Sequence, residues 1–556
     1  MLSDGIEAYD VRYLPIVRAY AEQIGLVEVI DQLVPSEMDV KPGHMVLAMI
    51  LDTLTGRSPL YHLESFFESQ DIELLLGQGY RVKSFNDDNI ERVLDKLYEA
   101  GTMKLFTEIA VRATRSFPVD KRYVHFDTTS KSVHGGYQPG IADPFAITFG
   151  HSKDHRPDLK QFVLSMLCVD RNVPIFGKTE DGNSSDKTVN NVILSEISCR
   201  MAKHGLGIGA YIYVADSALV SKINLRAAEV ERVLFITRFP STYKECGRAI
   251  TDAVATDEWL DLGRIAKTKP TANRPETTYK VHETRVALYG KNYRAVVVHS
   301  SAHDKRRQKK MDRELKEDRA AIEAAISDES KREYYCIRDA EAAAGRLCEV
   351  RSECHELAVE VIERPKYRRG RPRKDGSREV EEIRYALATE VKEREEAIAR
   401  RREEAGCFVL LSNVPEEGEL AHNAEEILKA YKQQHGIEQN FAFLKDPVIV
   451  NSIFLKKPQR IEALGLVLLL SLLIWRLMER SMRQYVESEK TELVGLNKRP
   501  TDSPTSLMIT RTFCSVMVIK VGNRRRLARP LSVAQFEYLK ALGVRVTVFT
   551  TPGPSG

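Results

Sequence analysis

The sequence predicts an α/β fold, and three features of its pattern predict it. Residues 1–118 repeat apolar side chains at spacings of three and four, the period of amphipathic helices. Short runs rich in β-branched and aromatic residues follow, and helical patterns separate them. A long, heavily charged region then interrupts the β-rich part. We therefore expect helices packed on a sheet, with a helical N-terminal domain and a large mixed β/helical insertion before the last helices of the core.

The chain has 556 residues, which is too long for one hydrophobic core, so we expect several domains. No internal repeat is present. The changes of pattern predict five parts: a helical N-terminal domain (1–118), the first part of an α/β core (119–240), an insertion with a basic helical region (241–405), the second part of the core (406–496) and a C-terminal accessory segment (497–556).

The first two parts are predicted element by element. Apolar periodicity, with Pro, Gly, Asn and Asp between the patterns, predicts helices within residues 14–34, 44–56 and 86–113. The core should contain strands within 122–130, 144–150 and 161–170, then a helix (185–205), a strand (210–219), a helix (221–231) and a strand (232–240).

The insertion combines strand-like runs with a charged region that we predict to be helical from about residue 304. Inside that region, "RPKYRRGRPRKDG" contains Arg369, Arg371 and Arg373 and no acid before its aspartate. Its Arg-Gly-Arg-Pro centre resembles a minor-groove AT-hook, so we expect phosphate contacts, groove reading or a solvated loop. The run at 407–415, "CFVLLSNVP", should be a strand that returns to the main sheet.

Composition restricts the class of protein. The chain is 43% hydrophobic and 29% charged with a net charge of +4, which permits nucleic acid binding without requiring it. Its eight cysteines form no C-x-x-C pair, which favours reduced cytosolic thiols over disulfides or a zinc site. No charged stretch followed by an apolar one stands at the start of the sequence, so we do not expect secretion. The apolar stretch 463–475 is shorter than the roughly 18 to 20 residues of a membrane span, so we expect a buried helix and no membrane.

Two predicted strands of the core end on an aspartate, Asp127 in "VHFDTTS" and Asp216 in "YVADSAL". A carboxylate there can reach a ligand at the sheet edge, but Asp is also common in turns and caps. Pairs of Mg²⁺ or Mn²⁺ ions require several such hard oxygen donors close together. A polar connection beside this site carries Lys153, Arg156 and Lys160, which touch DNA or stay solvated.

A third carboxylate lies in "YKQQHGIEQNFAFLKD", where Tyr431, Glu438 and Lys445 recur every seven residues. Seven residues make nearly two turns of an α-helix, so these side chains would share one face with Gln434. The stretch alone is either a solvated stripe or a functional surface.

The order β-Asp, β-Asp, helix-Glu resembles the D-D-E core of RNase H-like transposases. Around Glu438 the pattern is similar to the Y-x2-R-x3-E-x6-K signature of a large group of bacterial insertion-sequence transposases, with Gln434 in place of the arginine. The helical start and "FGHSKDHRPDLKQFVLSMLCVD" resemble the subgroup with a helical N-terminal domain. The resemblance covers roughly residues 1–490.

The resemblance implies that Asp127, Asp216 and Glu438 hold two Mg²⁺ or Mn²⁺ ions, one activating water or a DNA 3′-hydroxyl and one stabilising the leaving oxygen. Tyr431, Gln434 and Lys445 would steer the phosphate backbone. The implied partners are double-stranded DNA, as terminal inverted repeats and as target, and a second copy of the chain. The implied location is the bacterial cytoplasm, at the nucleoid.

Other roles remain open at this point. The same carboxylates would also suit a metal-dependent nuclease that cuts without joining, and a catalytically dead derivative could retain only DNA binding. The N-terminal helices would bind DNA ends or form a dimer. Trp259 would either hold a flipped base at a hairpin end or lie buried in the insertion.

Overall fold

The computed structural model describes residues 6–55, 62–138, 140, 143–170, 172–265, 276–349, 352–369, 378, 380–446 and 455–553. The chain forms two compact units. The first comprises Met1–Thr237, Val414–Ala421 and Ile427–Gly556, and the second comprises Arg238–Asn413 and His422–Glu426.

The N-terminal part of the first unit is helical, as the periodicity predicts. Its helices are α1 (Leu14–Gln23), α2 (Leu26–Leu33), α3 (Pro42–Leu54), α4 (Leu63–Glu68), α5 (Ile72–Leu76), α6 (Asp87–Ala100) and α7 (Thr102–Ser116). Every residue of α3 is buried, as expected for a helix that is apolar on nearly all sides. The Asn86 side chain caps α6 by accepting a hydrogen bond from the Asn89 N–H at 3.0 Å.

Five strands of the first unit form the α/β core in the order β4-β3-β2-β5-β6. They are β2 (Tyr123–Val133), β3 (Lys160–Val169), β4 (Val173–Glu180), β5 (Ile212–Ala215) and β6 (Leu234–Arg238). β2, β3 and β4 are antiparallel neighbours, whereas β5 runs parallel to both β2 and β6. The parallel strands are joined through α8 (Asp186–Lys203) and α9 (Lys222–Val230). The α/β prediction is confirmed. The strand predicted within 144–150 is wrong, because that segment forms only an isolated bridge between Thr148 and Gln161.

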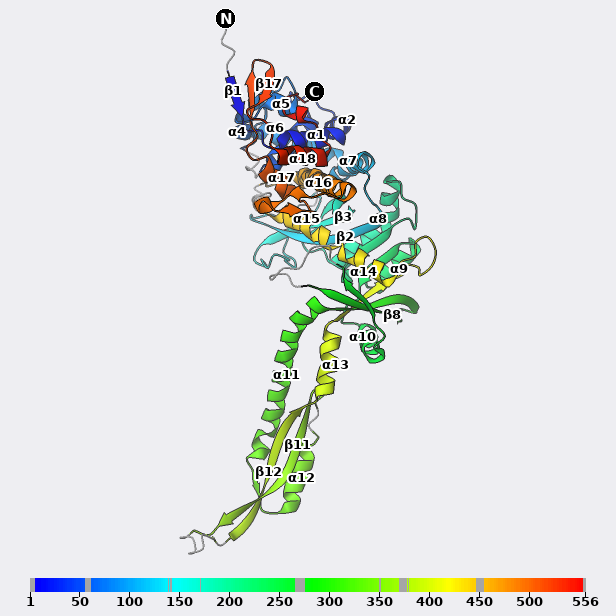
Figure 1. Cartoon of the computed structure of the whole chain (residues 1–556), viewed down its shortest axis with the longest axis vertical. Coiled ribbons are helices and arrows are strands. Elements are labelled where there is room, and N and C mark those ends of the chain that lie inside the picture. Colours follow the sequence, from blue (N-terminus) through cyan, green and yellow to red (C-terminus); the bar gives the residue numbers. More distant parts are fainter. Residues whose placement is uncertain are drawn as a thin grey trace. The chain divides into compact units, whose positions relative to one another are not determined.

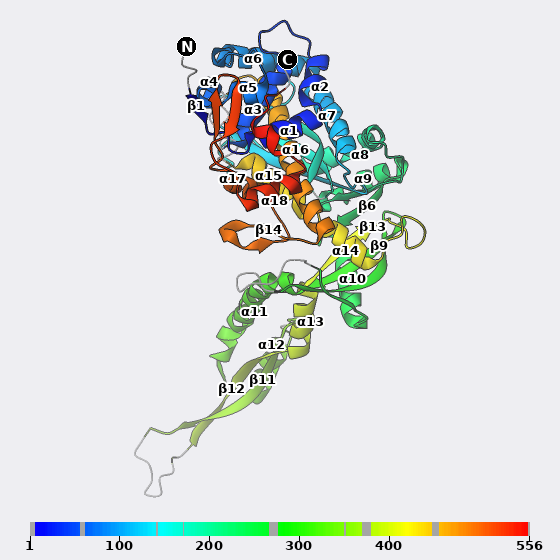
Figure 2. The same ribbon diagram turned by 45° about the horizontal axis from the view of Figure 1, so that its top comes forward.

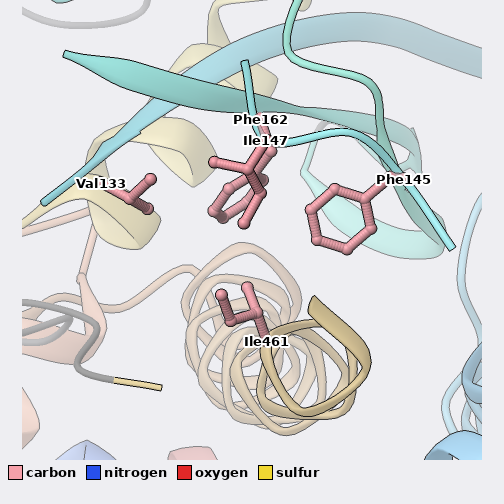
Figure 3. Close-up of a cluster of buried hydrophobic side chains, with 5 residues drawn as sticks. All are labelled: Val133, Phe145, Ile147, Phe162 and Ile461. Atoms are coloured by element: carbon pink, nitrogen blue, oxygen red, sulfur yellow. The ribbon is translucent and has the colours of Figure 1, made fainter. Parts of the chain in front are cut away.

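A long helix, α16 (Pro458–Glu489), packs against this core and against α1, α3, α6 and α7. Figure 3 shows Ile461 of α16 pointing toward Val133, Phe145, Ile147 and Phe162, all of which are buried. Among the described residues, α16 is the one helix long and apolar enough to cross a membrane by length and composition alone, yet 78% of its most apolar window is buried inside the structure. It therefore packs as the buried helix that the sequence predicts.

The C-terminal segment packs onto the helical N-terminal part. β1 (Ile6–Tyr9) pairs antiparallel with β16 (Val518–Val521), which in turn pairs with β17 (Arg524–Leu527). Figure 1 and Figure 2 both show this small sheet beside α4 and α5. The remaining elements are β14 (Leu493–Val494), β15 (Pro500–Thr501), α17 (Ser506–Thr512) and α18 (Val533–Leu542). Tyr20 of α1 donates a hydrogen bond to the main-chain oxygen of Leu542 at 2.9 Å.

The second unit contains a four-strand sheet portion in the order β13-β9-β8-β7. Its elements there are α10 (Lys244–Thr256), β7 (Leu260–Arg264), β8 (Thr278–Leu288), β9 (Lys291–Ser300) and β13 (Cys407–Ser412). The charged region supplies α11 (Ser301–Ser330), β10 (Glu333–Tyr334), α12 (Ile337–Leu347), β11 (His355–Tyr367), β12 (Val380–Glu393) and α13 (Glu395–Ala405).

The prediction that this charged region is helical is wrong in its second half, because β11 and β12 form a long antiparallel ribbon there. Leu357, Val359 and Val361 alternate with exposed residues along β11 and pack on the buried side of α12. An alternation of period two buries one face of a strand, and this local pattern overrides the high charge of the region.

Candidate active site

Asp127 and Asp216 lie on neighbouring parallel strands of the core. Asp127 is inside β2 rather than at the strand end that we predicted, because antiparallel pairing with β3 extends the strand to Val133. Asp216 follows the last residue of β5. The β2–β5 register pairs His125 with Val214, and two further residues in this register place Asp127 level with Asp216. Adjacent strands lie about 4.8 Å apart, so the two carboxylates are neighbours.

Local hydrogen bonds orient both carboxylates. The Thr128 N–H donates to Asp127 Oδ1 at 2.8 Å, and the Ala218 N–H donates to Asp216 Oδ1 at 3.0 Å. The Asp216 main-chain oxygen accepts a hydrogen bond from the Thr237 hydroxyl at 2.6 Å. Each carboxylate keeps its other oxygen for a further ligand.

A third carboxylate, Asp186 in the first turn of α8, joins this pair. The pKa of Asp127 is raised to about 7, mainly by burial, and the charges of Asp216 and Asp186 contribute to that increase. Burial also raises the pKa of Asp216, and Asp186 adds to that increase. Burial and the neighbouring negative charges therefore disfavour the charged forms of Asp127 and Asp216. Sequence reasoning missed Asp186 because an acid just after the Ser185 cap is typical of any helix start.

Lys153 supplies positive charge to the same cluster. Its Nζ lies 3.4 Å from Asp186 Oδ2 and donates hydrogen bonds to Thr128, to the main-chain oxygen at 2.8 Å and to Oγ1 at 3.0 Å. The Lys153 charge also opposes the pKa increases of Asp127 and Asp216. An ammonium group thus partly neutralises the carboxylate cluster.

Glu438 lies on α15 (His435–Lys445), a helix that packs against β2. The buried Asn440 of this helix donates a hydrogen bond to the main-chain oxygen of Asn172 at 2.8 Å. The Glu438 side chain is 65% exposed, and its Oε2 lies 2.8 Å from His435 Nδ1. The structure therefore brings Asp127 and Asp216 together and turns the Glu438 carboxylate toward His435.

The single helix expected to carry Tyr431, Glu438 and Lys445 is interrupted. Tyr431 belongs to α14 (Ala424–Lys432), and two residues separate the end of α14 from the start of α15. At the junction the Gln434 N–H bonds to the Tyr431 oxygen and the Ile437 N–H to the Gln434 oxygen, both three residues back. Hydrogen bonds that reach three residues back form 3₁₀ turns, whereas those of an α-helix reach four residues back. The face predicted to carry Tyr431, Glu438 and Lys445 is therefore interrupted at Gln434.

The predicted phosphate-steering residues have different environments. Gln434 is buried, and Tyr431 is half-buried. Lys445 Nζ donates to Asp154 Oδ1 at 2.6 Å, next to Lys153 in the chain. This ion pair places Lys445 close to the segment that carries Lys153.

The basic run and Trp259 belong to the second unit. Arg369 is exposed just after β11, whereas Arg371 and Arg373 lie outside the described residues. Trp259 is half-buried, with Lys280 Nζ 4.8 Å from its ring centre and the His299 ring 6.3 Å away. Trp259 therefore packs against the β8–β9 hairpin.

Within the described residues, the side chains of this site do not form a complete metal-binding set. Among the residues that the structure describes, no three or more histidine, cysteine, aspartate or glutamate side chains are arranged to hold a metal ion. The core of the site is the pair Asp127 and Asp216, with Asp186 and Lys153 beside it.

Comparison with known proteins adds two similarities. A family model described as a domain of unknown function, DUF4277, matches residues 6–111, which form the helical N-terminal part. The cryo-EM structure of the piggyBac transposase synaptic complex with hairpin DNA is similar at 9% identity, covering 90% of this chain and 79% of that chain with a TM-score of 0.38. No curated protein matched the sequence.

Proposed function

We propose that the protein is a DNA transposase that cuts the ends of a mobile element and joins them to target DNA. The observation that supports this function is the pairing of Asp127 and Asp216 on adjacent parallel strands, in a core with the strand order β4-β3-β2-β5-β6. The helix that bears Glu438 packs against the strand that bears Asp127. The sequence pattern around Glu438 completes the acidic triad that such an enzyme requires.

The carboxylates suit divalent cations. Asp127 and Asp216 offer oxygen donors, which Mg²⁺ and Mn²⁺ prefer, and their raised pKa values mark a site where additional positive charge would be stabilising. Two bound ions would activate the attacking hydroxyl and stabilise the leaving oxygen. Glu438 would join the other two acids once its side chain rotates away from His435.

The reaction consists of two displacements at phosphorus. Water adds to an end phosphodiester and the 3′-oxygen leaves as a free hydroxyl, which then attacks a target phosphodiester and displaces its 3′-oxygen. Lys153 and Lys445 would bind the DNA backbone, exchanging Asp186 and Asp154 for phosphate oxygens. Gln434 and Tyr431 would position the helix junction, and Arg369, Arg371 and Arg373 would add phosphate contacts.

A joining assay tests the function. Purified protein, Mg²⁺ and a circular target plasmid are incubated with labelled duplexes taken from the DNA on each side of the reading frame, where a mobile element would carry inverted repeats. A transposase attaches the labelled 3′-hydroxyl to the plasmid, whereas a nuclease releases cut ends only and a catalytically dead derivative leaves the duplex intact. Because two ends are joined, we expect a dimer in the DNA complex.

The raised pKa of Asp127 predicts a pH dependence of metal-free stability. The carboxyl titrates near pH 4 when unfolded and at about 7 when folded, so the folded state binds the proton more tightly. This group stabilises the fold fully below about pH 4, and that contribution is lost as the pH rises through about 7. Mg²⁺ should therefore raise the melting temperature more at pH 8 than at pH 6, because it binds the ionised carboxylates.

Differential scanning fluorimetry with EDTA or Mg²⁺ measures both effects. Asp127→Asn should flatten the metal-free pH dependence between pH 4 and 7 and abolish most of the Mg²⁺ effect. Equal Mg²⁺ shifts in the wild type and the variant would contradict the assignment of Asp127 as a ligand.

A further inference from the structure

The C-terminal segment carries a large share of the positive charge of the protein. Residues 497–556 contain ten lysines and arginines but only two acids, Asp502 and Glu537, whereas the net charge of the whole chain is +4. The rest of the chain is therefore net acidic. A concentration of positive charge in one short segment points to an anionic partner.

The β16–β17 hairpin separates its basic residues onto two faces. Lys520 pairs with Arg525 in the antiparallel register, so their side chains share the face toward α5. Arg525 bonds to Asp71 and Glu73, and Lys520 lies 3.1 Å from Glu73. These ion pairs fix the hairpin to the helical part of the unit.

The other face presents arginines to solvent. Arg524 and Arg526 alternate with Arg525 along β17 and are exposed, as is Arg529 just after the strand. Within the described part of the chain, these three guanidinium groups have no ion pair or side-chain hydrogen bond. β17 is also the edge of its sheet, because the order is β1-β16-β17.

We propose that the outer face of the β16–β17 hairpin, together with Arg529 just after it, is a surface that binds duplex DNA and contacts phosphates through Arg524, Arg526 and Arg529. This inference rests on the proposed function, because DNA is the anion that the active site would cut. Arginine forms two parallel hydrogen bonds to one phosphate, and a β-ribbon is narrow enough to follow a DNA groove. The ion pairs of the inner face would hold the hairpin backbone in place, so DNA binding would not have to order it.

The test measures DNA binding without cutting. The full chain carrying Asp216→Asn is titrated onto a labelled 30-base-pair duplex in EDTA at several salt concentrations, with and without Arg524→Gln, Arg526→Gln and Arg529→Gln together. We expect the triple variant to bind about 10-fold or more weakly and the slope of log affinity against log salt to fall by about 2 to 3, since each lost phosphate contact removes about 0.9. Its melting temperature should be unchanged, because the three side chains have no partner to lose.

A matched triple with the same loss of charge is the control: Arg81→Gln, Arg92→Gln and Arg248→Gln, all exposed positions elsewhere in the chain. Equal losses in the two triples, or no duplex binding by the parent protein, would overturn the proposal. A hairpin triple that loses binding to phosphatidylserine vesicles but keeps duplex affinity would also overturn it. The binding test does not depend on catalysis. A protein that binds duplex DNA but does not nick it would still agree with the hairpin proposal, and nicking activity alone would not support that proposal.

Discussion

Asp216→Asn should lower Mg²⁺-dependent nicking of the end duplex by about 1,000-fold or more, equal to about 4 kcal/mol at the transition state. The asparagine oxygen can still accept the Ala218 N–H, so the local turn is preserved and only the charge and the ligand oxygen are altered. Because burial and the Asp186 charge disfavour ionised Asp216, removing its charge should not lower the melting temperature at pH 8.

The measurement is the initial rate of nicking on a denaturing gel, together with a melting curve of each protein. Asp158→Asn is the control, since Asp158 is 58% exposed and pairs with Arg156 on the surface. Nicking by Asp216→Asn within a factor of ten of the wild-type rate would remove Asp216 from the reaction.

Asp71→Ala should cost about 3 to 5 kcal/mol of the free energy of unfolding. Asp71 and Arg525 are both 2% exposed in their side chains, and Arg525 Nε lies 2.6 Å from Asp71 Oδ2. Without Asp71 the buried guanidinium retains only the half-exposed Glu73, and α5 also loses the cap that Asp71 provides to the Leu74 N–H.

Denaturant unfolding of the two neighbouring arginine variants provides the sharpest comparison. Arg525→Met leaves the Asp71 charge buried and should be strongly destabilising, whereas Arg526→Met should stay within about 0.5 kcal/mol of the wild type because its side chain is exposed and unpaired. Equal costs for Arg525→Met and Arg526→Met would show that the ion pair does not anchor the hairpin.

The helical start and most of the core strands and helices could be predicted along the chain because they are local periodic patterns. The strand β4 was missed, and the strand predicted within 144–150 is only an isolated bridge between Thr148 and Gln161. The position of Asp127 inside a strand could not, since the antiparallel partner β3 that extends β2 lies more than 25 residues further along the chain. The sequence near Gln434 has no proline that would predict a break in the helix, and Gly436 is the one weak helix former nearby.

The acidic cluster also combines residues that the sequence indicates with one that it does not. Asp127 and Asp216 are recognisable because each follows a β-rich run, but Asp186 has the appearance of an ordinary helix-capping residue. Its role depends on Thr128 and Lys153, whose proximity is a product of the tertiary fold. The ion pair that anchors the C-terminal segment could not be predicted from the sequence either, because Asp71 and Arg525 are 454 residues apart.

Iron-directed cleavage of the protein backbone tests most directly whether the three acids serve one metal site. Fe²⁺ replaces Mg²⁺ in the complex with the end duplex, and ascorbate with peroxide generates radicals that cut the chain near bound iron. The account predicts cuts next to Asp127, Asp216 and Glu438 together, all suppressed by excess Mg²⁺ and by Asp216→Asn. Cuts near Asp127 and Asp216 with none near Glu438 would contradict it.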